Sequence, residues 1–266
     1  MSVINLAINE FDLTQEEIGF IRTRHSSKQL AFALLFKYYQ KSHQFINDLT
    51  KLPVFLINQV AGQLNIPPVI SDISSRTYGN YISLIRQYFK TSFSKKAHYK
   101  ELEIWIKDIL LPTHHLADEE IKNQAIQYLK ERGIELFKEK TMRRIILDAT
   151  NAFENILFEN LQSSLSTEDE AQLNGLLLPY KEGLSYLGWI NKEINNPSLD
   201  SILRLMEQLS ILNRFNFDVA IIQAIPRKRI VHYSEAFTRL NPSDLKQMAD
   251  NKRCADSFMY CHTRKE

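Results

Sequence analysis

Basic side chains gather between Ile73 and Lys100, where they could contact a polyanion. This segment holds six Lys or Arg residues and no Asp or Glu: Arg76, Arg86, Lys90, Lys95, Lys96 and Lys100. Positive side chains bind phosphate oxygens, and Arg or Thr can also hydrogen-bond to base edges. The chemistry that these residue types indicate is nucleic-acid recognition. The alternative is a surface helix that is basic by chance, because small basic clusters are common.

These basic residues need a helix to hold them on one side. Ser74 or Ser75 is suited to cap a helix N-terminus, because a short hydroxyl side chain accepts from free backbone amides. Apolar residues follow at helical spacing and predict one buried face, formed by Tyr78, Ile82, Ile85 and Phe89. The polar positions of the same helix are the expected DNA contacts: Arg76, Thr77, Tyr81, Arg86 and Lys90.

Three helices are expected before this one. Thr14 and Glu17 form a capping-box pattern for a helix that runs to about residue 25. A second helix, from about 27 to 43, is apolar on most faces and is predicted to lie at the centre of its domain. A third covers 54–64 and ends ahead of a proline pair. This order is typical of a helix-turn-helix unit. Phosphate contacts that hold the register are expected from Arg22, Arg24, Lys28, Lys95 and Lys96.

A similar pattern follows in the next part of the chain. A helix over 97–111 is expected to stop at Pro112, a second begins at Asp118 and ends at Gly133, and a long third helix reaches about residue 165. The start of the long helix carries five further candidate DNA contacts: Lys138, Lys140, Thr141, Arg143 and Arg144. Basic groups oppose the dipole at a helix N-terminus unless an anion meets them. The alternative is a weak pair between Arg143 or Arg144 and an acid such as Glu139.

The remaining residues predict a helical scaffold. Helices are expected from Thr167, from a Ser198 cap to residue 213, over 234–240, over 242–250, and from residue 253 onward. His114 and His115 are interpreted as loop residues, because no metal-ligating partner lies at suitable spacing. Cys254 and Cys261 are interpreted as buried thiols.

Composition supports an all-α protein and excludes several classes of function. The chain has 44% hydrophobic residues and only 7 Gly among 266 residues. No apolar run approaches the ~20 residues of a membrane span, and no secretory signal is present, so a cytoplasmic location is expected. Residues 1–100 carry a net charge of +6 and the remainder −4, which points to an anionic partner for the first part. No phosphate loop, metal-spaced set or nucleophile motif was found, so no catalytic, cofactor or metal site is predicted.

The order of these features resembles the N-terminal region of transposases of the Tn-three family. The similar stretches begin at Leu13-Thr-Gln-Glu-Glu, continue through 30–38, 45–52 and 59–66, and include Ser74-Ser-Arg-Thr and Ile85-Arg. Later ones are 132–136, 141–149, Ile225-Pro-Arg-Lys-Arg and 250–255. The chain departs from the family pattern at Ile46, where Pro is usual, at Ser75, where Gly is usual, and at Tyr81, where His is common.

The resemblance implies sequence-specific binding of duplex DNA, namely the terminal inverted repeats of a transposon. Such transposases carry a metal-dependent RNase-H-like core in their C-terminal part, so it implies that this chain is a DNA-binding region without catalysis. Any divalent metal is expected only in that missing part, through which self-association is also possible.

The sequence therefore predicts consecutive helical bundles with helix-turn-helix-like modules at 1–95 and 96–165 and a helical scaffold at 166–266. Two alternatives stay open. One is a protein-interaction scaffold whose basic face meets an acidic partner. The other is a small enzyme that acts on nucleic acid.

Overall fold

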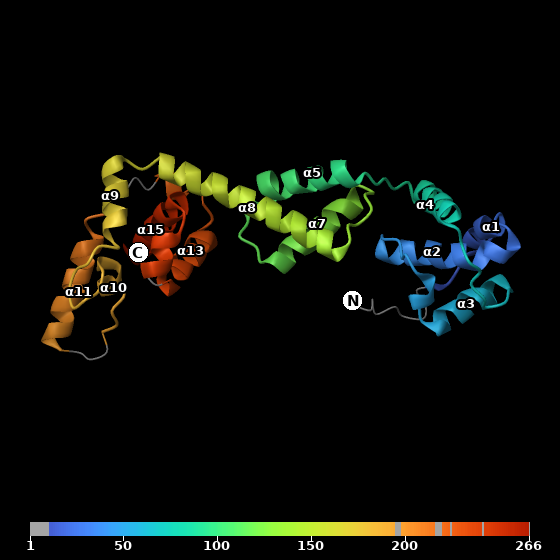
Figure 1. Ribbon diagram of the computed structural model, residues 1–266, viewed down its shortest axis with the longest axis horizontal. Coiled ribbons are helices and arrows are strands. Elements are labelled where there is room, and N and C mark those ends of the chain that lie inside the picture. Colours follow the sequence, from blue (N-terminus) through green and yellow to red (C-terminus); the bar gives the residue numbers. More distant parts are fainter. Residues whose placement is uncertain (1–10, 195–197, 216–219, 224, 241, 266) are drawn as a thin grey trace. The chain divides into compact units, whose positions relative to one another are not determined.

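The computed structural model is all-α, as the sequence predicts (Figure 1). It describes residues 11–194, 198–215, 220–223, 225–240 and 242–265. Within these ranges there is no strand, and the only β-type pairings are isolated bridges between Ser92 and Ile134 and between Pro179 and Ser185. The predicted break at Asn195–Pro197 and part of the apolar run at 219–225 lie outside the described residues.

The chain divides into two compact units that differ from simple consecutive segments. Unit 1 comprises Met1–Leu102 and Lys122–Ile145, and unit 2 comprises Glu103–Ile121 and Ile146–Glu266. All fifteen candidate DNA contacts fall within unit 1, because the second basic group starts at Lys138 and ends at Arg144. The three predicted functional modules stay a prediction.

Unit 1 is built around α2, which the sequence predicted as a central helix. Its first helices are α1 (Gln15–Arg22), α2 (Gln29–Ser42), α3 (Val54–Leu64) and α4 (Ser75–Phe89). Every side chain from Leu30 to Phe36 on α2 is buried, and these residues pack against apolar residues of α1, α3 and α4. The first helix is shorter than predicted, because it ends at Arg22 and a 3-10 turn at Ser26–Lys28 precedes α2.

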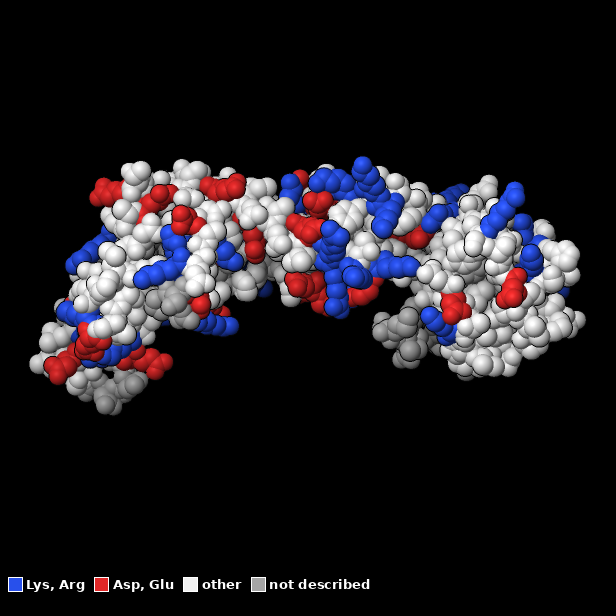
Figure 2. Space-filling model, in the orientation of Figure 1, with Lys and Arg blue, Asp and Glu red and all other residues white. Residues whose placement is uncertain are grey.

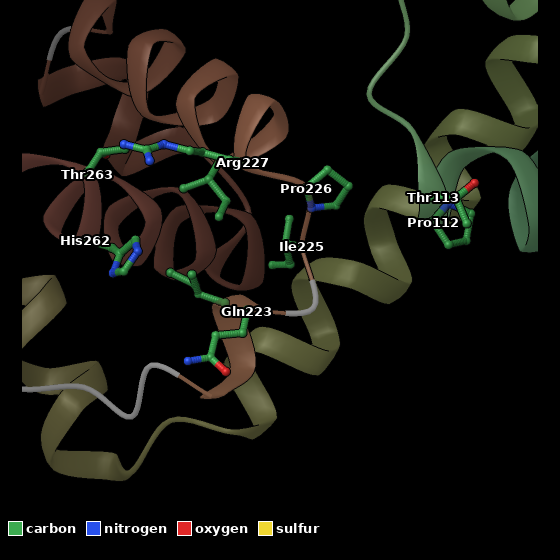
Figure 3. A pocket seen from close by; sticks show the side chains of 10 residues that line it. Pro112, Thr113, Gln223, Ile225, Pro226, Arg227, His262 and Thr263 are labelled. Atoms are coloured by element: carbon green, nitrogen blue, oxygen red, sulfur yellow. The ribbon is translucent and has the colours of Figure 1, made fainter. Parts of the chain in front are cut away.

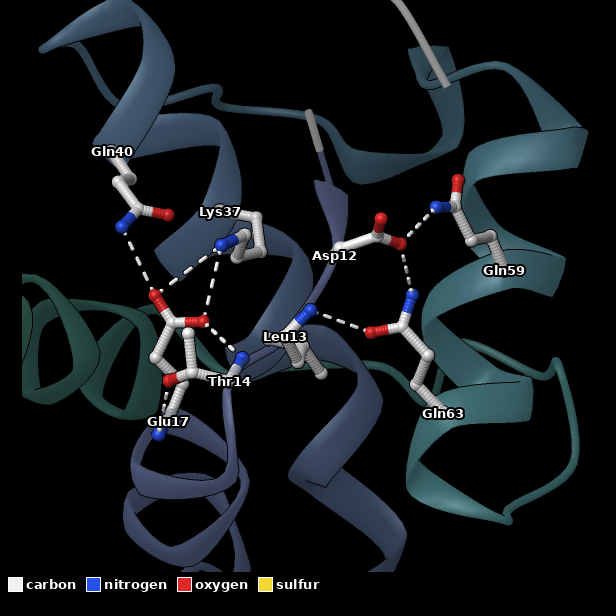
Figure 4. Close-up of polar contacts among 8 residues, drawn as sticks. All are labelled: Asp12, Leu13, Thr14, Glu17, Lys37, Gln40, Gln59 and Gln63. Atoms are coloured by element: carbon white, nitrogen blue, oxygen red, sulfur yellow. Dashed lines mark hydrogen bonds and ion pairs between the residues drawn. The ribbon is translucent and has the colours of Figure 1, made fainter. Parts of the chain in front are cut away.

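A buried ion pair fastens α1 to α2 (Figure 4). Both carboxylate oxygens of Glu17 accept from Lys37 Nζ, at 3.3 and 3.1 Å, and Gln40 Nε2 donates to the same carboxylate at 3.0 Å. Glu17 also completes the predicted capping box with Thr14. Residues 18–47 contain no Asp or Glu, so the exposed charges of this segment are all basic.

The rest of unit 1 comes from three helices that also continue into unit 2. They are α5 (Lys95–Trp105), α7 (Asp118–Glu131) and α8 (Glu139–Ser163). Gly133 ends the α7 region with φ +63°, as its predicted role as a helix stop requires. The preceding helix, which the sequence predicts to stop at Pro112, continues one residue further, to Thr113. A π-helical segment at Ile106–Leu110 leads into the short α6 (Leu111–Thr113). Pro112 lies in the first turn of α6, where a helix accepts proline because no backbone N–H is needed there.

Unit 2 is a second helical core. Its helices are α9 (Thr167–Gly175), α10 (Tyr186–Ile190), α11 (Leu199–Leu212), α12 (Ala220–Gln223), α13 (Arg227–Arg239), α14 (Pro242–Gln247) and α15 (Asp250–Lys265). Ser198 caps α11 as predicted. The helix predicted at 234–240 begins earlier, at Arg227, because Ile230 and Tyr233 extend its buried face. Cys254 and Cys261 are both buried, as expected.

Candidate nucleic-acid interface

The N-terminus of α4 presents Arg76 to solvent. Ser74 caps this helix, since its hydroxyl accepts from the Thr77 backbone N–H at 3.2 Å. Arg76 is exposed in the first turn, whereas Thr77 is half-buried and its hydroxyl lies 2.9 Å from the Ser74 hydroxyl. The first turn therefore offers one long cationic side chain at a helix terminus, where free amides also favour an anion.

Tyr81 is a core residue and not a surface contact, which corrects the role predicted for it. Its side chain is 6% exposed, and its ring meets Phe32 edge to face at 4.9 Å. Burial raises the pKa of the Tyr81 hydroxyl above its usual value. Of the apolar face predicted for this helix, Tyr78, Ile85 and Phe89 pack in the core of unit 1, and Tyr81 joins them in place of Ile82.

Arg86 is held inside unit 1 by a carboxylate, and its contact with DNA stays a prediction. Its Nε and Nη2 donate to one oxygen of Glu135, at 2.9 and 2.7 Å. Its guanidinium lies over the rings of Phe45 and Phe93, at 5.5 and 5.4 Å from their centroids. Burial raises the pKa of the Glu135 carboxyl, and the hydrogen bonds from Arg86 oppose that rise. Arg86 therefore joins α4 to the segment ahead of α8.

A short backbone pairing brings the two predicted basic groups together. The Ser92 N–H donates to Gly133 O at 3.0 Å, and the Glu135 N–H donates to Ser92 O at 3.2 Å. Beside it, the ring of Phe137 packs against Phe93 at 5.7 Å. Residues that follow α4 and residues that precede α8 are thus neighbours, although some forty positions separate them in the sequence.

Five exposed lysines flank this pairing, and we call them the basic edge: Lys90, Lys95, Lys96, Lys138 and Lys140. Lys90 closes α4 in the left-handed region with φ 53°, and Lys95 and Lys96 open α5, whose first turn has no acid. Figure 2 shows Lys and Arg side chains clustered over α5. Lys95 and Lys96 sit at the N-terminus of α5, and Lys138 and Lys140 sit at that of α8. These four cations oppose the helix dipole there and favour an anion arriving from outside.

The predicted DNA contacts in the first turns of α8 differ in their exposure and in their acidic partners. Arg143 Nε donates to Glu139 Oε1 at 3.0 Å, which is the alternative that the sequence left open, and Lys122 Nζ lies 3.2 Å from the same oxygen. The hydrogen bond from Arg143, followed by that from Lys122, lowers the pKa of the Glu139 carboxyl. Arg143 and Arg144 are nonetheless exposed, while Thr141 is half-buried. An exposed pair of this kind contributes only ~0.3–0.5 kcal/mol, so it yields readily to a phosphate.

The predicted contacts near α1 differ in exposure. Arg22 is exposed at the end of α1, and Lys28 is half-buried in the following 3-10 turn. Arg24 donates twice to the Thr23 hydroxyl, at 3.0 and 2.6 Å, and lies over the rings of Phe20 and Phe32. Packing fixes the Arg24 guanidinium, so it is the least adaptable of the three.

Sequence reasoning missed two residues that shape this region. Glu135 fixes Arg86, and no local pattern could reveal that pairing because the partners are 49 positions apart. Lys130 is exposed in the last turn of α7, three residues before Gly133. Burial, followed by the charge of Lys130, lowers the pKa of His43. A cation near a helix C-terminus was the sequence signal for Lys130.

A cavity of about 680 Å³ in unit 2 was considered as an alternative site (Figure 3). Its polar lining includes Gln223, Arg227, His262 and Thr263, from α12, α13 and α15. Across the described residues, no three His, Cys, Asp or Glu side chains gather as metal ligands do. The cavity therefore adds no residue set to the enzyme alternative, and the absence of catalysis stays a prediction.

None of the helices in the described ranges is both long enough and apolar enough to span a bilayer.

Comparisons with known proteins agree with the resemblance drawn from the sequence. The transposase for transposon Tn1546 of Enterococcus faecium is 20% identical over 257 residues, which cover 94% of this chain and 26% of that relative. The transposase for transposon Tn2501 of Escherichia coli is 21% identical over 254 residues, covering 91% and 25%. The chain thus spans about a quarter of the length of these relatives.

A family model described as "Domain of unknown function (DUF4158)" matches residues 7–149, a range that contains every candidate DNA contact. Because this match covers more than half of the 266 residues, the chain belongs to the DUF4158 family.

Proposed function

We propose that this chain binds the terminal inverted repeats of a transposon as the DNA-binding region of a transposase. The observation that carries the proposal is the basic edge, where exposed lysines from two distant segments meet around one backbone pairing in unit 1. The similarity to two transposases supports DNA as the polyanion. In this proposal, strand cleavage and its divalent metal belong to parts of the transposase beyond this chain.

Roles within the interface follow from exposure. Arg76 reads bases from the N-terminus of α4, while the basic edge and Arg22, Lys28, Arg143 and Arg144 neutralise phosphates. Arg76 and Lys90 lie at opposite ends of α4, roughly 20 Å apart at 1.5 Å per residue. This separation is a little over half of the ~34 Å helical turn of B-DNA, so one duplex can meet both ends.

Two substitutions separate base reading from phosphate binding. Arg76→Ala should weaken binding to a duplex carrying the terminal repeat by about tenfold or more, and binding to a random duplex of equal length much less. Lys96→Ala should weaken both by a similar, smaller factor. Fluorescence anisotropy at fixed salt measures both affinities. Lys51→Ala, an exposed lysine beside Asp48, is the control and should change neither. Equal losses on the two duplexes for Arg76→Ala would remove its base-reading role.

A further inference from the structure

Helix α11 carries its apolar residues on the outside of unit 2. Six of them are exposed: Leu199 at 72%, Ile202 at 57%, Leu203 at 55%, Leu205 at 47%, Met206 at 62% and Leu209 at 46%. At 100° per residue they form one continuous face, with Ser210 as the exposed polar residue within it. We call these six residues the α11 face.

Three polar side chains of α11, those of Arg204, Glu207 and Gln208, contact other parts of unit 2. Gln208 is buried, and its Nε2 donates to Trp189 O at 2.8 Å and to Lys192 O at 3.1 Å. Glu207 accepts from the Tyr180 hydroxyl and from Lys181 Nζ. The Arg204 guanidinium lies 5.3 Å from the centre of the Trp189 ring. These contacts fix the orientation of α11. The helix therefore cannot rotate about its axis to bury the exposed leucines.

The exposed area is large for a surface that remains in water. At roughly 200 Å² for a fully exposed large apolar residue, the α11 face presents roughly 700 Å², which is above the usual size of the largest apolar patch on a monomer. A standard interface buries about 800 Å² per partner. The face therefore supplies most of what a stable pairing of two surfaces needs.

The spacing of the α11 face indicates what covers it. The six positions are symmetric about Arg204, because Leu199 mirrors Leu209, Ile202 mirrors Met206, and Leu203 mirrors Leu205. A two-fold interface needs this self-complementarity, since residue i of one copy meets residue j of the other and the reverse. An unrelated partner imposes no such symmetry on a helix.

We propose that the α11 face is a two-fold interface with a second copy of this chain, in which two α11 helices pack antiparallel. Ile202 of one copy then lies against Met206 of the other, and Leu199 against Leu209. The antiparallel arrangement also places the N-terminus of each helix beside the C-terminus of its mate, which their dipoles favour. This inference goes beyond DNA binding, because it concerns unit 2 and needs no nucleic acid.

The mass of the full chain in solution tests the interface. Sedimentation equilibrium between ~1 and ~100 µM should give a dimer of twice the 31.1 kDa chain mass. The double substitution Ile202→Glu/Met206→Glu should weaken dimerisation by about 100-fold or more, because it would bury four carboxylates at the axis. Leu147→Glu, at an exposed leucine of α8, is the matched control and should leave the dimer intact. A chain that is monomeric at ~100 µM, or a double variant that dimerises as well as the control, overturns the proposal.

Disulfide trapping tests the orientation without relying on a destabilised variant. Ile202→Cys/Met206→Cys should form a covalent dimer under mild oxidation, while the native thiols stay unreactive because they are buried. Leu199→Cys alone should not cross-link, since its symmetry mate is about 15 Å along the helix. Efficient linkage through Leu199→Cys alone would indicate parallel helices and would refute the antiparallel interface.

Discussion

Arg86 and Glu135 carry opposite charges at the joint between the two basic segments of unit 1. The Glu135 side chain is 10% exposed, and Arg86 supplies both of its close charged hydrogen bonds. If Glu135 loses its partner, a buried carboxylate is left unpaired. The stability lost in this way is greater than the stability that the intact pair contributes. Arg86 therefore fixes where α4 ends relative to the start of α8, and in the proposed interface it would act on DNA binding only through that positioning.

Removal of Arg86 should destabilise the chain more than removal of an exposed arginine. We expect Arg86→Ala to lower the free energy of unfolding by about 3 kcal/mol, because Glu135 stays buried and unpaired. Arg143→Ala, which breaks only the exposed pair with Glu139, should cost at most about 0.5 kcal/mol. Chemical denaturation measures both. Similar losses in the two variants would mean that solvent reaches Glu135 freely.

Asp256 in unit 2 is a buried acid whose ionisation opposes folding. Its side chain is 3% exposed, and Oδ1 has no hydrogen-bond partner within the part of the chain that the structure describes. Burial raises the pKa of Asp256 to about 7, with Lys252 lowering it and Glu154 raising it further. The pKa of Asp256 is higher in the folded state than in the unfolded state. The free energy of unfolding is therefore larger at acid pH and decreases as the pH rises toward 7.

The substitution Asp256→Asn should remove this pH dependence. The variant should be more stable than the parent, and this difference in free energy of unfolding should be about 2 kcal/mol larger at pH 8 than at pH 5. Denaturation at the two pH values gives the difference. A constant difference would place the Asp256 pKa near its ordinary value.

Helix ends decide the shape of the basic edge. Gly133 has φ +63°, and a Cβ added there would lie 3.4 Å from the carbonyl oxygen of Lys90. This glycine lets the chain turn out of α7 and pair with Ser92, which sets Lys138 beside α5. By contrast, Gly79 lies in the exposed middle of α4 with nothing within 4 Å of an added Cβ.

The two glycines should respond in opposite ways to alanine. Gly133→Ala should cost about 1–2 kcal/mol of stability through left-handed strain and should weaken DNA binding by shifting the basic edge. Gly79→Ala should add roughly 0.5–1 kcal/mol, since Ala is the better helix former. Thermal melts and anisotropy compare them. Unchanged DNA affinity in a folded Gly133→Ala chain would separate the basic edge from binding.

Over the whole molecule, charge and apolar surface are assigned to different units. Unit 1 holds the basic residues predicted to meet DNA, and unit 2 carries the α11 face. The proposed DNA contacts and the proposed dimer interface therefore share no residue.

Salt should govern DNA affinity if the basic edge and its neighbours neutralise phosphates. With six to ten phosphates engaged, log affinity should fall against log salt with a slope of roughly −5 to −9. Titrations between 50 and 200 mM NaCl determine it. A slope near −1 would contradict an extended phosphate interface.

Local patterns in the sequence determined most helices of this protein. Thr14 with Glu17, Ser74, Ser198 and Gly133 each mark a helix end through contacts within a few residues, so composition and spacing suffice to place them. The all-α class follows for the same reason.

Only the tertiary structure decided which of the marked side chains face outward. Tyr81 turned to the core and Arg86 to Glu135 because α2 and the segment at 133–137 occupy one side of α4. The segments that carry Lys90 and Lys138 became neighbours through the pairing of Ser92 with Gly133 and Glu135. Each of these outcomes depends on a contact between positions tens of residues apart, and such contacts leave no periodic mark in a single sequence.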